Sequence, residues 1–150
     1  MNKRTFIDCM AASLISVFFA ASALAQATPN KASQPSGAQR VVIQVSDAEP
    51  AKWNLALNNA KNVQEELGAK NVEIEIVAYG PGIGMLKFDA PAASRIGDAV
   101  KAGIKVVACE NTMRAQKLNK ADMNADVGYV PAGVVEIMQR QAQGWAYLRP

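Results

Sequence analysis

The chain has 150 residues, half of them apolar, with 16 lysines and arginines against 13 aspartates and glutamates, and it contains no histidine. The absence of histidine excludes a Ser-His-Asp triad, a Cys-His dyad and a zinc site built on histidine ligands. The basic residues are scattered along the chain and form no stripe, which argues against nucleic acid as a partner.

Residues 1–25 have the pattern of a signal peptide. Lys3 and Arg4 give a basic start, residues 10–24 form an apolar run, and residues 23–25 have the small-x-small pattern that a signal peptidase cuts after Ala25. We therefore expect a periplasmic or secreted protein with no membrane segment after cleavage. The alternative is an uncleaved anchor, which we disfavour because the apolar run is shorter than the about 20 residues of a membrane-spanning helix.

Residues 26–39 are predicted to be a flexible linker, because they are rich in proline, serine and glycine and contain no large apolar side chain. Residues 40–150 are then about 110 residues, the size of one ordinary domain. Cys9 leaves with the predicted signal peptide. Cys109 is therefore the only cysteine of the expected mature chain, and it has no partner for an intramolecular disulfide.

The domain begins with two predicted strands separated by a helix. Residues 41–45 are a short β-branched run, typical of a buried strand. Residues 51–67 repeat apolar side chains at steps of three and four, which predicts a helix that Gly68 ends. Residues 72–79 predict a second strand, on which Glu73 and Glu75 are interpreted as part of a solvated edge.

A glycine-rich stretch follows the second predicted strand. Gly80, Gly82 and Gly84 occupy alternate positions, as glycines do in some phosphate-binding loops. The Gly-Lys-Ser/Thr ending and the full G-x-G-x-x-G pattern are both absent. We therefore favour a plain loop over a phosphate-binding loop.

The second half of the domain continues the alternation of helices and strands. Residues 91–102 predict a helix, and residues 104–108 predict a strand that leads into a helix capped by Asn111 or Thr112. Residues 127–130 predict a short strand. Pro131 is expected to open the last helix and Gly144 to cap it, before a terminal strand at residues 145–148.

This alternation predicts an α/β fold with three layers, α/β/α, and a mostly parallel sheet of about five strands. Right-handed crossovers bring the carboxyl ends of parallel strands to one edge of the sheet, where ligands and chemistry gather. Three loops share that edge in this prediction: residues 46–49, 80–89 and 109–111.

Cys109 is the candidate for chemistry at this edge. A thiol reacts as its thiolate, and the start of the following helix presents free N–H groups that stabilise an anion. Arg114 is expected to assist, whereas the neighbouring carboxylate of Glu110 opposes thiolate formation. The alternative is that Cys109 is a small, inert core residue, since free cysteine is among the most buried residue types.

Several segments resemble one known family. These are the strand Val41-Ile43-Val45, the glycine-proline loop after the second strand, the segment VVACENTM at residues 106–113, and the closing segment VPAGVVEIMQRQAQGWAYLRP. Together they resemble the DsrE/DsrF-like family of sulfur-relay proteins, which includes the Tus subunits, and above all its small exported members.

The resemblance implies a three-layer α/β/α domain that assembles into homo- or hetero-oligomers, often trimers or hexamers. It also implies that Cys109 carries a persulfide between a sulfur donor protein and an acceptor protein. Neither a cofactor nor a metal is expected, and a classical turnover enzyme is not expected. The residues expected to bind the substrate or partner around Cys109 are Asn111, Thr112, Arg114, Gly80, Gly82 and Met85.

Two alternatives to sulfur carriage stay open. In the first, the strand-edge crevice binds a ligand or partner without covalent chemistry, and residues 80–89 act as its gate. A variant of this alternative has Cys109 bind a soft metal with Met113 or Met85, because thiolate and thioether ligands favour Cu(I). In the second, the oligomer itself is the function, with Trp145 and Tyr147 as candidate interface residues, although core packing is the favoured interpretation of both.

Overall fold

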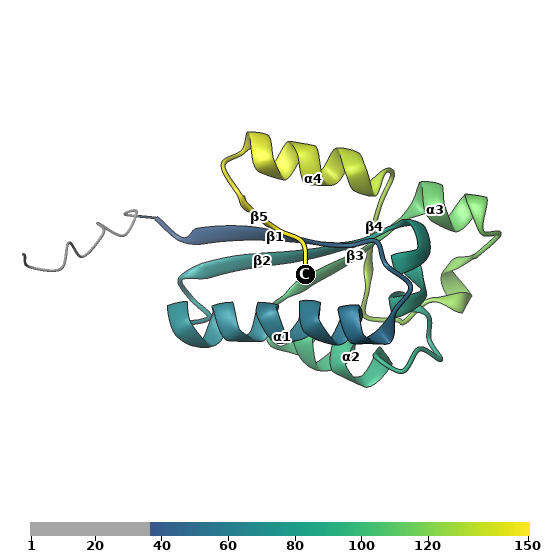
Figure 1. Cartoon of the computed structure of the whole chain (residues 1–150), viewed down its shortest axis with the longest axis horizontal. Helices are drawn as coiled ribbons and strands as arrows, with labels where there is room; N and C mark the ends of the chain where they lie inside the picture. Colours follow the sequence, from purple (N-terminus) through teal and green to yellow (C-terminus); the bar gives the residue numbers. More distant parts are fainter. Residues whose placement is uncertain (1–36) are drawn as a thin grey trace, which may run out of the picture. The chain divides into compact units, whose positions relative to one another are not determined.

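The computed structural model describes residues 37–150, so the predicted signal peptide and residues 26–36 of the predicted linker lie outside the described part. The described residues form alternating strands and helices around one five-stranded sheet (Figure 1). None of the helices in this range is both long and apolar enough to cross a lipid bilayer.

All neighbouring strands of the sheet are parallel, and their order is β4-β3-β2-β1-β5. This confirms the prediction of a mostly parallel sheet of about five strands. The three inner strands β3, β2 and β1 carry the longest apolar runs, as strands buried on both faces do. The strands are β1 (Gln39–Val45), β2 (Val72–Ala78), β3 (Lys105–Cys109), β4 (Gly128–Val130) and β5 (Ala146–Leu148).

Helices cover both faces of the sheet, which confirms the three-layer architecture (Figure 1). Helices α1 and α2 lie on one face and α4 lies on the other, while the short α3 follows β3 directly at the end of the sheet. The helices are α1 (Pro50–Leu67), α2 (Ala93–Lys101), α3 (Glu110–Ala115) and α4 (Gly133–Ala142), and the two 3-10 helices are η1 (Gly80–Leu86) and η2 (Lys120–Asp122).

Successive side chains of a strand point to opposite faces, so the same strands build two cores. The buried side chains on the α1 and α2 side include Val41, Ile43, Val45, Ile74 and Ile76. Those on the α4 side are Val42, Val77, Val107, Val130, Ile137 and Trp145. The interpretation of Glu75 as part of a solvated edge is wrong, because Glu75 is fully buried on the α4 side. Glu73 is exposed.

The predicted helix ends at Gly68 and Gly144 are confirmed. Gly68 follows α1 with φ +85° and Gly144 lies just after α4 with φ +82°, a left-handed conformation that glycine adopts without steric cost. The helix predicted at residues 91–102 is shorter, since α2 spans Ala93–Lys101.

Three local predictions differ from the structure around the end of the sheet. The stretch predicted to be a plain loop is the 3-10 helix η1, ordered by the complete burial of Ile83, Met85 and Leu86. Helix α3 begins at Glu110, with Cys109 in the N-cap position in place of Asn111 or Thr112. Helix α4 begins at Gly133 and not at Pro131, because residue 132 is extended with φ −145° and ψ 111°.

Candidate functional site

Cys109 lies where β3 ends and α3 begins. It is the last residue of β3, it pairs with Val130 of β4, and it is the N-cap residue of α3. The apolar sequence Val106-Val107-Ala108 explains its depth, because this run occupies an inner strand of the sheet. Cys109 is a free cysteine and is 5% exposed, so the thiol is almost fully covered in the isolated chain.

The surroundings of Cys109 act on the pKa of its thiol in two opposite directions. Burial on its own raises the pKa of this thiol. The Thr112 hydroxyl and the backbone N–H groups of Gly133, Thr112 and Asn111 act in the opposite direction and together hold the pKa of Cys109 below its ordinary value of 9.0. Two segments far apart in the sequence supply these donors, the first turn of α3 and the first residue of α4. The site therefore favours the thiolate.

The side chain of Thr112 connects Cys109 to the glycine-rich segment. Its Oγ1 accepts a hydrogen bond from the backbone N–H of Gly80 at 2.9 Å, which leaves the hydroxyl hydrogen free to point at the thiol. The Gly80 carbonyl oxygen in turn accepts a hydrogen bond from Nε2 of Gln116 at 3.1 Å. The structure therefore brings together Cys109, Thr112 and Gly80, all three of which are predicted site residues.

Gly133 is the residue of this site that the sequence did not indicate. A Cβ atom at Gly133 would lie 3.1 Å from the Cβ of Tyr79 and 3.2 Å from the Cβ of Cys109. The lack of a side chain at residue 133 lets the start of α4 approach the ends of β2 and β3 this closely, because a Cβ there would push its neighbours aside by a few tenths of an ångström. Gly133 lies two residues after Pro131, where helix α4 was predicted to begin, and hydrophobic periodicity does not mark a single glycine. Its contact with Cys109 exists only because the chain returns across the sheet.

The side chains of Asn111, Arg114 and Met85, and the backbone of Gly82, have other contacts. The Asn111 side chain accepts a hydrogen bond from Arg114, and both groups are at the surface. A Cβ at Gly82 would lie 2.3 Å from the carbonyl oxygen of Val45, so Gly82 serves the close packing of η1 on the end of β1. Met85 is fully buried in the core on the α1 and α2 side.

Metal ligands do not gather near the thiol. Among residues 37–150, no group of three or more cysteine, aspartate or glutamate side chains is placed to hold a metal ion. Met113 and Met85 both belong to the apolar core on the α1 and α2 side. The positions of both methionines therefore favour core packing over the Cu(I) variant.

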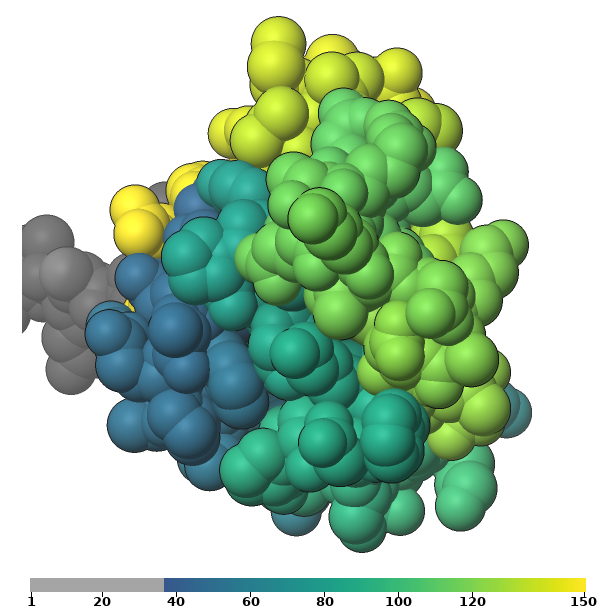
Figure 2. Space-filling model, turned by 90° about the vertical axis from the view of Figure 1, so that its right-hand side faces the viewer, coloured from purple at the N-terminus to yellow at the C-terminus, as the bar shows by residue number. Residues whose placement is uncertain are grey.

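The segments that cover the carboxyl ends of the strands, where Cys109 lies, are visible from the end of the domain (Figure 2). Figure 2 looks along the sheet from the side on which α3 lies, and the green segment that contains α3 fills the space next to the yellow α4. The backbone N–H of Asn111 donates to the carbonyl oxygen of Pro131 at 3.1 Å, which joins these two segments directly beside Cys109. The thiol thus lies beneath a junction between α3 and the segment leading into α4.

Comparisons with known proteins agree with this architecture. The sequence profile described as the DsrE/DsrF-like family matches residues 39–150. No curated protein matches the chain significantly.

Several solved structures are similar to this chain. A protein of unknown function from Methanobacterium thermoautotrophicum is 33% identical with a TM-score of 0.72, over 75% of this chain and 99% of that one. The ychN protein from E. coli is 15% identical with a TM-score of 0.62, over 75% and 99% of the two chains. A conserved protein of unknown function from Bacteroides thetaiotaomicron is 14% identical with a TM-score of 0.62, over 75% and 95%. The last two show the fold alone.

Proposed function

Because the chain belongs to the DsrE/DsrF-like family, we propose that Cys109 is a sulfur carrier that accepts sulfane sulfur as a persulfide and passes it on in a sulfur relay. One observation carries this proposal: Cys109 ends the inner strand β3, occupies the N-cap position of α3 and packs against Gly133 at the start of α4, among N–H and O–H donors that lower its pKa. A carrier thiol works as its thiolate, and these donors favour the thiolate at the cysteine that the family resemblance singles out.

The transfer step needs only the thiolate and a donor persulfide. The Cys109 thiolate attacks the terminal sulfur of the donor, a new S–S bond forms at Cys109, and the S–S bond of the donor breaks as the donor leaves as a thiolate. The terminal S–H proton moves with the transferred sulfur, and no external oxidant or reductant is consumed. Transfer to the acceptor is the same exchange in the opposite direction.

Access to Cys109 is part of the proposal. The residue is 5% exposed, and the segments that cover it are joined by the hydrogen bond from Asn111 to Pro131. We propose that a donor protein reaches the thiol when this junction opens. Three exposed apolar side chains lie on α4, at 50%, 45% and 67% exposure: Val134, Val135 and Met138.

The same apolar side chains support assembly. We propose that the protein forms a homo-oligomer, a trimer or a hexamer, through a surface that includes α4. Native mass spectrometry is the test, with Met138→Lys as the variant that places a charge in that surface. A monomeric wild-type protein would overturn this part of the proposal.

Export is a separate element of the proposed function. The predicted cleavage after Ala25 supports a periplasmic or secreted location. Amino-terminal sequencing of the protein recovered from the exported fraction is expected to start at Gln26. A protein that keeps residues 1–25 inside the cell would contradict export.

One observation favours a different function. The burial of Cys109 is what an inert core cysteine would show, and it supports the alternative of a non-catalytic module that binds a ligand or a partner. Under this alternative the exposed side chains of α4 bind the partner, and the thiol takes no part.

The deciding experiment measures sulfur uptake. The purified protein is incubated with polysulfide or with a low-molecular-weight persulfide, and its intact mass is recorded beside that of a Cys109→Ser variant. We expect the wild-type protein alone to gain the mass of a sulfur atom and to lose it on treatment with a thiol reductant. An unchanged mass with both donors would favour the non-catalytic module.

A further inference from the structure

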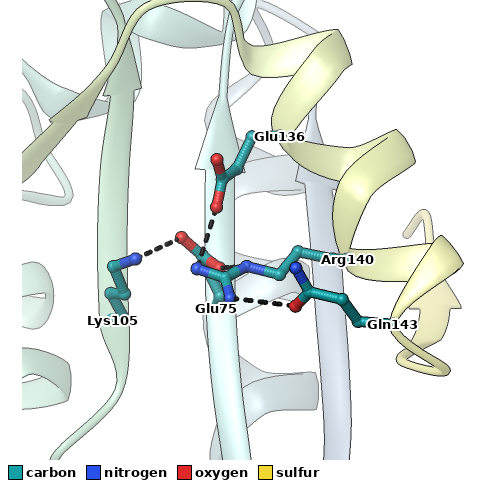
Figure 3. Close-up of polar contacts among 5 residues, drawn as sticks. All are labelled: Glu75, Lys105, Glu136, Arg140 and Gln143. Carbon is teal, nitrogen blue, oxygen red and sulfur yellow. Dashed lines mark hydrogen bonds and ion pairs between the residues drawn. The ribbon is translucent and has the colours of Figure 1, made fainter.

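A fully buried carboxylate, that of Glu75, lies on the α4 side of the sheet. Its partner in the sheet register is Lys105, at the opposite end of β3 from Cys109. Glu75 belongs to the inner strand β2 and has no exposed surface. Its Oε1 is 2.9 Å from Nζ of Lys105 on β3, and its Oε2 forms an ion pair with Nε of Arg140 on α4 (Figure 3). A buried carboxylate is expensive unless it is paired, so the position of Arg140 is strongly constrained.

Arg140 is held on further sides. Its Nη2 is 2.8 Å from Oε1 of Glu136 one turn earlier on α4, and its guanidinium carbon is 4.7 Å from the ring centre of Trp145 (Figure 3 shows the polar contacts). Only 20% of the Arg140 side chain is exposed. The planar guanidinium group is thus fixed by ion pairs with Glu75 and Glu136 and by the ring of Trp145. Any slide of α4 along the sheet would separate this group from Glu75.

The ion pair and the thiol lie along the same two strands. Glu75, Val77 and Tyr79 follow one another at alternate positions along β2 and just beyond it, on the face that α4 covers. On β3 the corresponding positions are Lys105, Val107 and Cys109, and the sheet register pairs Glu75 with Lys105 and Val77 with Val107.

Helix α4 spans the distance between these two points. Arg140 binds Glu75 at one end, and Gly133 contacts Val77, Tyr79 and Cys109 at the other. Seven helical residues rise about 10 Å, and four strand residues extend about 13 Å, so the helix reaches from one end of this strand pair to the other. Ile137 packs between the two ends in the core on this side.

We infer that Glu75 and Arg140 are positioning residues for Cys109: their ion pair fixes α4 along β2 and β3 and thereby keeps Gly133, at the start of α4, packed against Cys109. Neither residue contacts the thiol, so both act through the helix. The inference deepens the proposed function and depends on it for its purpose, because a carrier thiol reacts as its thiolate and the packing around Cys109 has to favour that form. The lowered pKa of Cys109, to which the Gly133 N–H contributes, agrees with this geometry.

The test replaces the ion pair by apolar side chains of similar size. In the Glu75→Leu, Arg140→Met double variant, α4 keeps an apolar contact with the sheet and no fully buried charge remains, because the Lys105 and Glu136 side chains are 53% and 16% exposed, so the domain is expected to fold. The readout is the pKa of the Cys109 thiol, measured by ultraviolet titration of the thiolate in the full chain. This readout does not depend on access to the thiol, which a looser α4 would also change.

We expect the thiol pKa to rise in the double variant and the thiolate population at neutral pH to fall about three- to tenfold, the factor that loss of one hydrogen bond to the sulfur implies. Arg140→Lys keeps the charge without the planar geometry and should shift the pKa in the same direction by less. This single variant also decides the question if the double variant does not fold. A folded variant with an unchanged thiol pKa would overturn the inference.

Two controls separate positioning from general loosening. The Lys61→Gln, Glu65→Gln variant removes an exposed ion pair of α1 at 3.4 Å and should leave the thiol pKa unchanged. Ile96→Val removes one methyl group from the core on the other side of the sheet and should lower stability without moving the thiol pKa. An equal rise of the thiol pKa in the Ile96→Val variant would show that any destabilisation raises this pKa, and would overturn the inference.

The same variants keep the two proposals apart when sulfur uptake is measured by intact mass. A wild-type protein that never gains sulfur overturns sulfur carriage. The comparison of thiol pKa values between the wild-type protein and the variants then still tests the positioning role of Glu75 and Arg140. Conversely, a wild-type protein that gains sulfur while the double variant keeps its thiol pKa overturns the positioning role and leaves sulfur carriage in place.

Discussion

The two faces of the sheet differ in chemistry, although the same strands supply both. The face under α1 and α2 is apolar, and its buried side chains are held mainly by packing, as Ile43 and Ile76 illustrate. The face under α4 has a smaller apolar core, and it also holds the buried Glu75 and the thiol of Cys109. The first face depends on how much apolar surface is buried, whereas the second depends on where individual polar atoms lie.

This difference assigns separate roles to the two faces. Burial of apolar surface tolerates small shifts of a helix, because it has no preferred direction. Hydrogen bonds and ion pairs lose their strength when their atoms move by less than an ångström. We therefore expect changes on the α1 and α2 face to act mainly on stability, and changes on the α4 face to act on the pKa of Cys109.

The largest loss of stability is expected from Ile43→Ala. Ile43 is fully buried on the α1 and α2 face, so its truncation leaves a cavity and should lower the free energy of unfolding by about 2–5 kcal/mol. Urea denaturation measures this change, and ultraviolet titration of the thiolate should show the same pKa of Cys109 as in the wild-type protein. A shifted thiol pKa would mean that the two faces are not separate in their effects.

Gly133→Ala is expected to disturb both stability and the thiol. The added Cβ would lie 3.1 Å from the Cβ of Tyr79 and 3.2 Å from that of Cys109, and both atoms are attached to backbone at the ends of inner strands. We expect a loss of about 1–3 kcal/mol from this overpacking, together with a higher pKa of Cys109 because the residue-133 N–H moves away. Gly97→Ala in α2 is the matched control, since its added Cβ meets only a side-chain oxygen of Asp126, at 3.2 Å.

Thr112→Val removes a hydroxyl and keeps the shape of the side chain. The change leaves the Gly80 N–H without its acceptor and the Cys109 sulfur without one donor, so it should cost about 1 kcal/mol of stability and raise the pKa of Cys109. Thr112→Ser keeps the hydroxyl and should keep the thiol pKa low. If Thr112→Ser and Thr112→Val give the same thiol pKa, the hydroxyl has no part in activating Cys109.

The smallest expected effect is a dependence of stability on pH. The pKa of Cys109 is lowered from 9.0 in the folded protein, so folding favours the thiolate. Its contribution is present above the unfolded pKa and is lost as the pH falls through the folded pKa. The stability of the wild-type protein relative to Cys109→Ser should therefore rise as the pH rises toward 9 and level off above it. Urea denaturation at a series of pH values measures this difference, and a flat difference would contradict the lowered pKa.

The sequence predicted the elements of this fold better than it predicted the contacts of the site. Hydrophobic periodicity is local, and it was enough to place the strands, the three layers and Cys109 at the end of an inner strand. Family resemblance pointed to Cys109 as the functional residue, and the structure brings Gly80 and Thr112 to it through hydrogen bonds.

The missed contacts all join segments that are distant in the sequence. Glu75 meets Arg140 and Cys109 meets Gly133 only because α4 returns across β2 and β3. A charged residue between Ile74 and Ile76 has the alternation of a half-exposed strand, and nothing nearby in the sequence shows that a cation will cover it. Met85 was predicted to line the site because it follows a glycine-rich stretch, yet it is completely buried in the core on the α1 and α2 side.

Sulfur uptake as a function of pH tests the central claim most directly. The full chain and its Cys109→Ser variant are exposed briefly to a low-molecular-weight persulfide at a series of pH values, and the sulfur bound is read from the intact mass. Our account predicts uptake by the wild-type protein alone, with a midpoint at the thiol pKa of Cys109, below the ordinary value of 9.0. Uptake that persists in Cys109→Ser, or that is absent across the series, would contradict it.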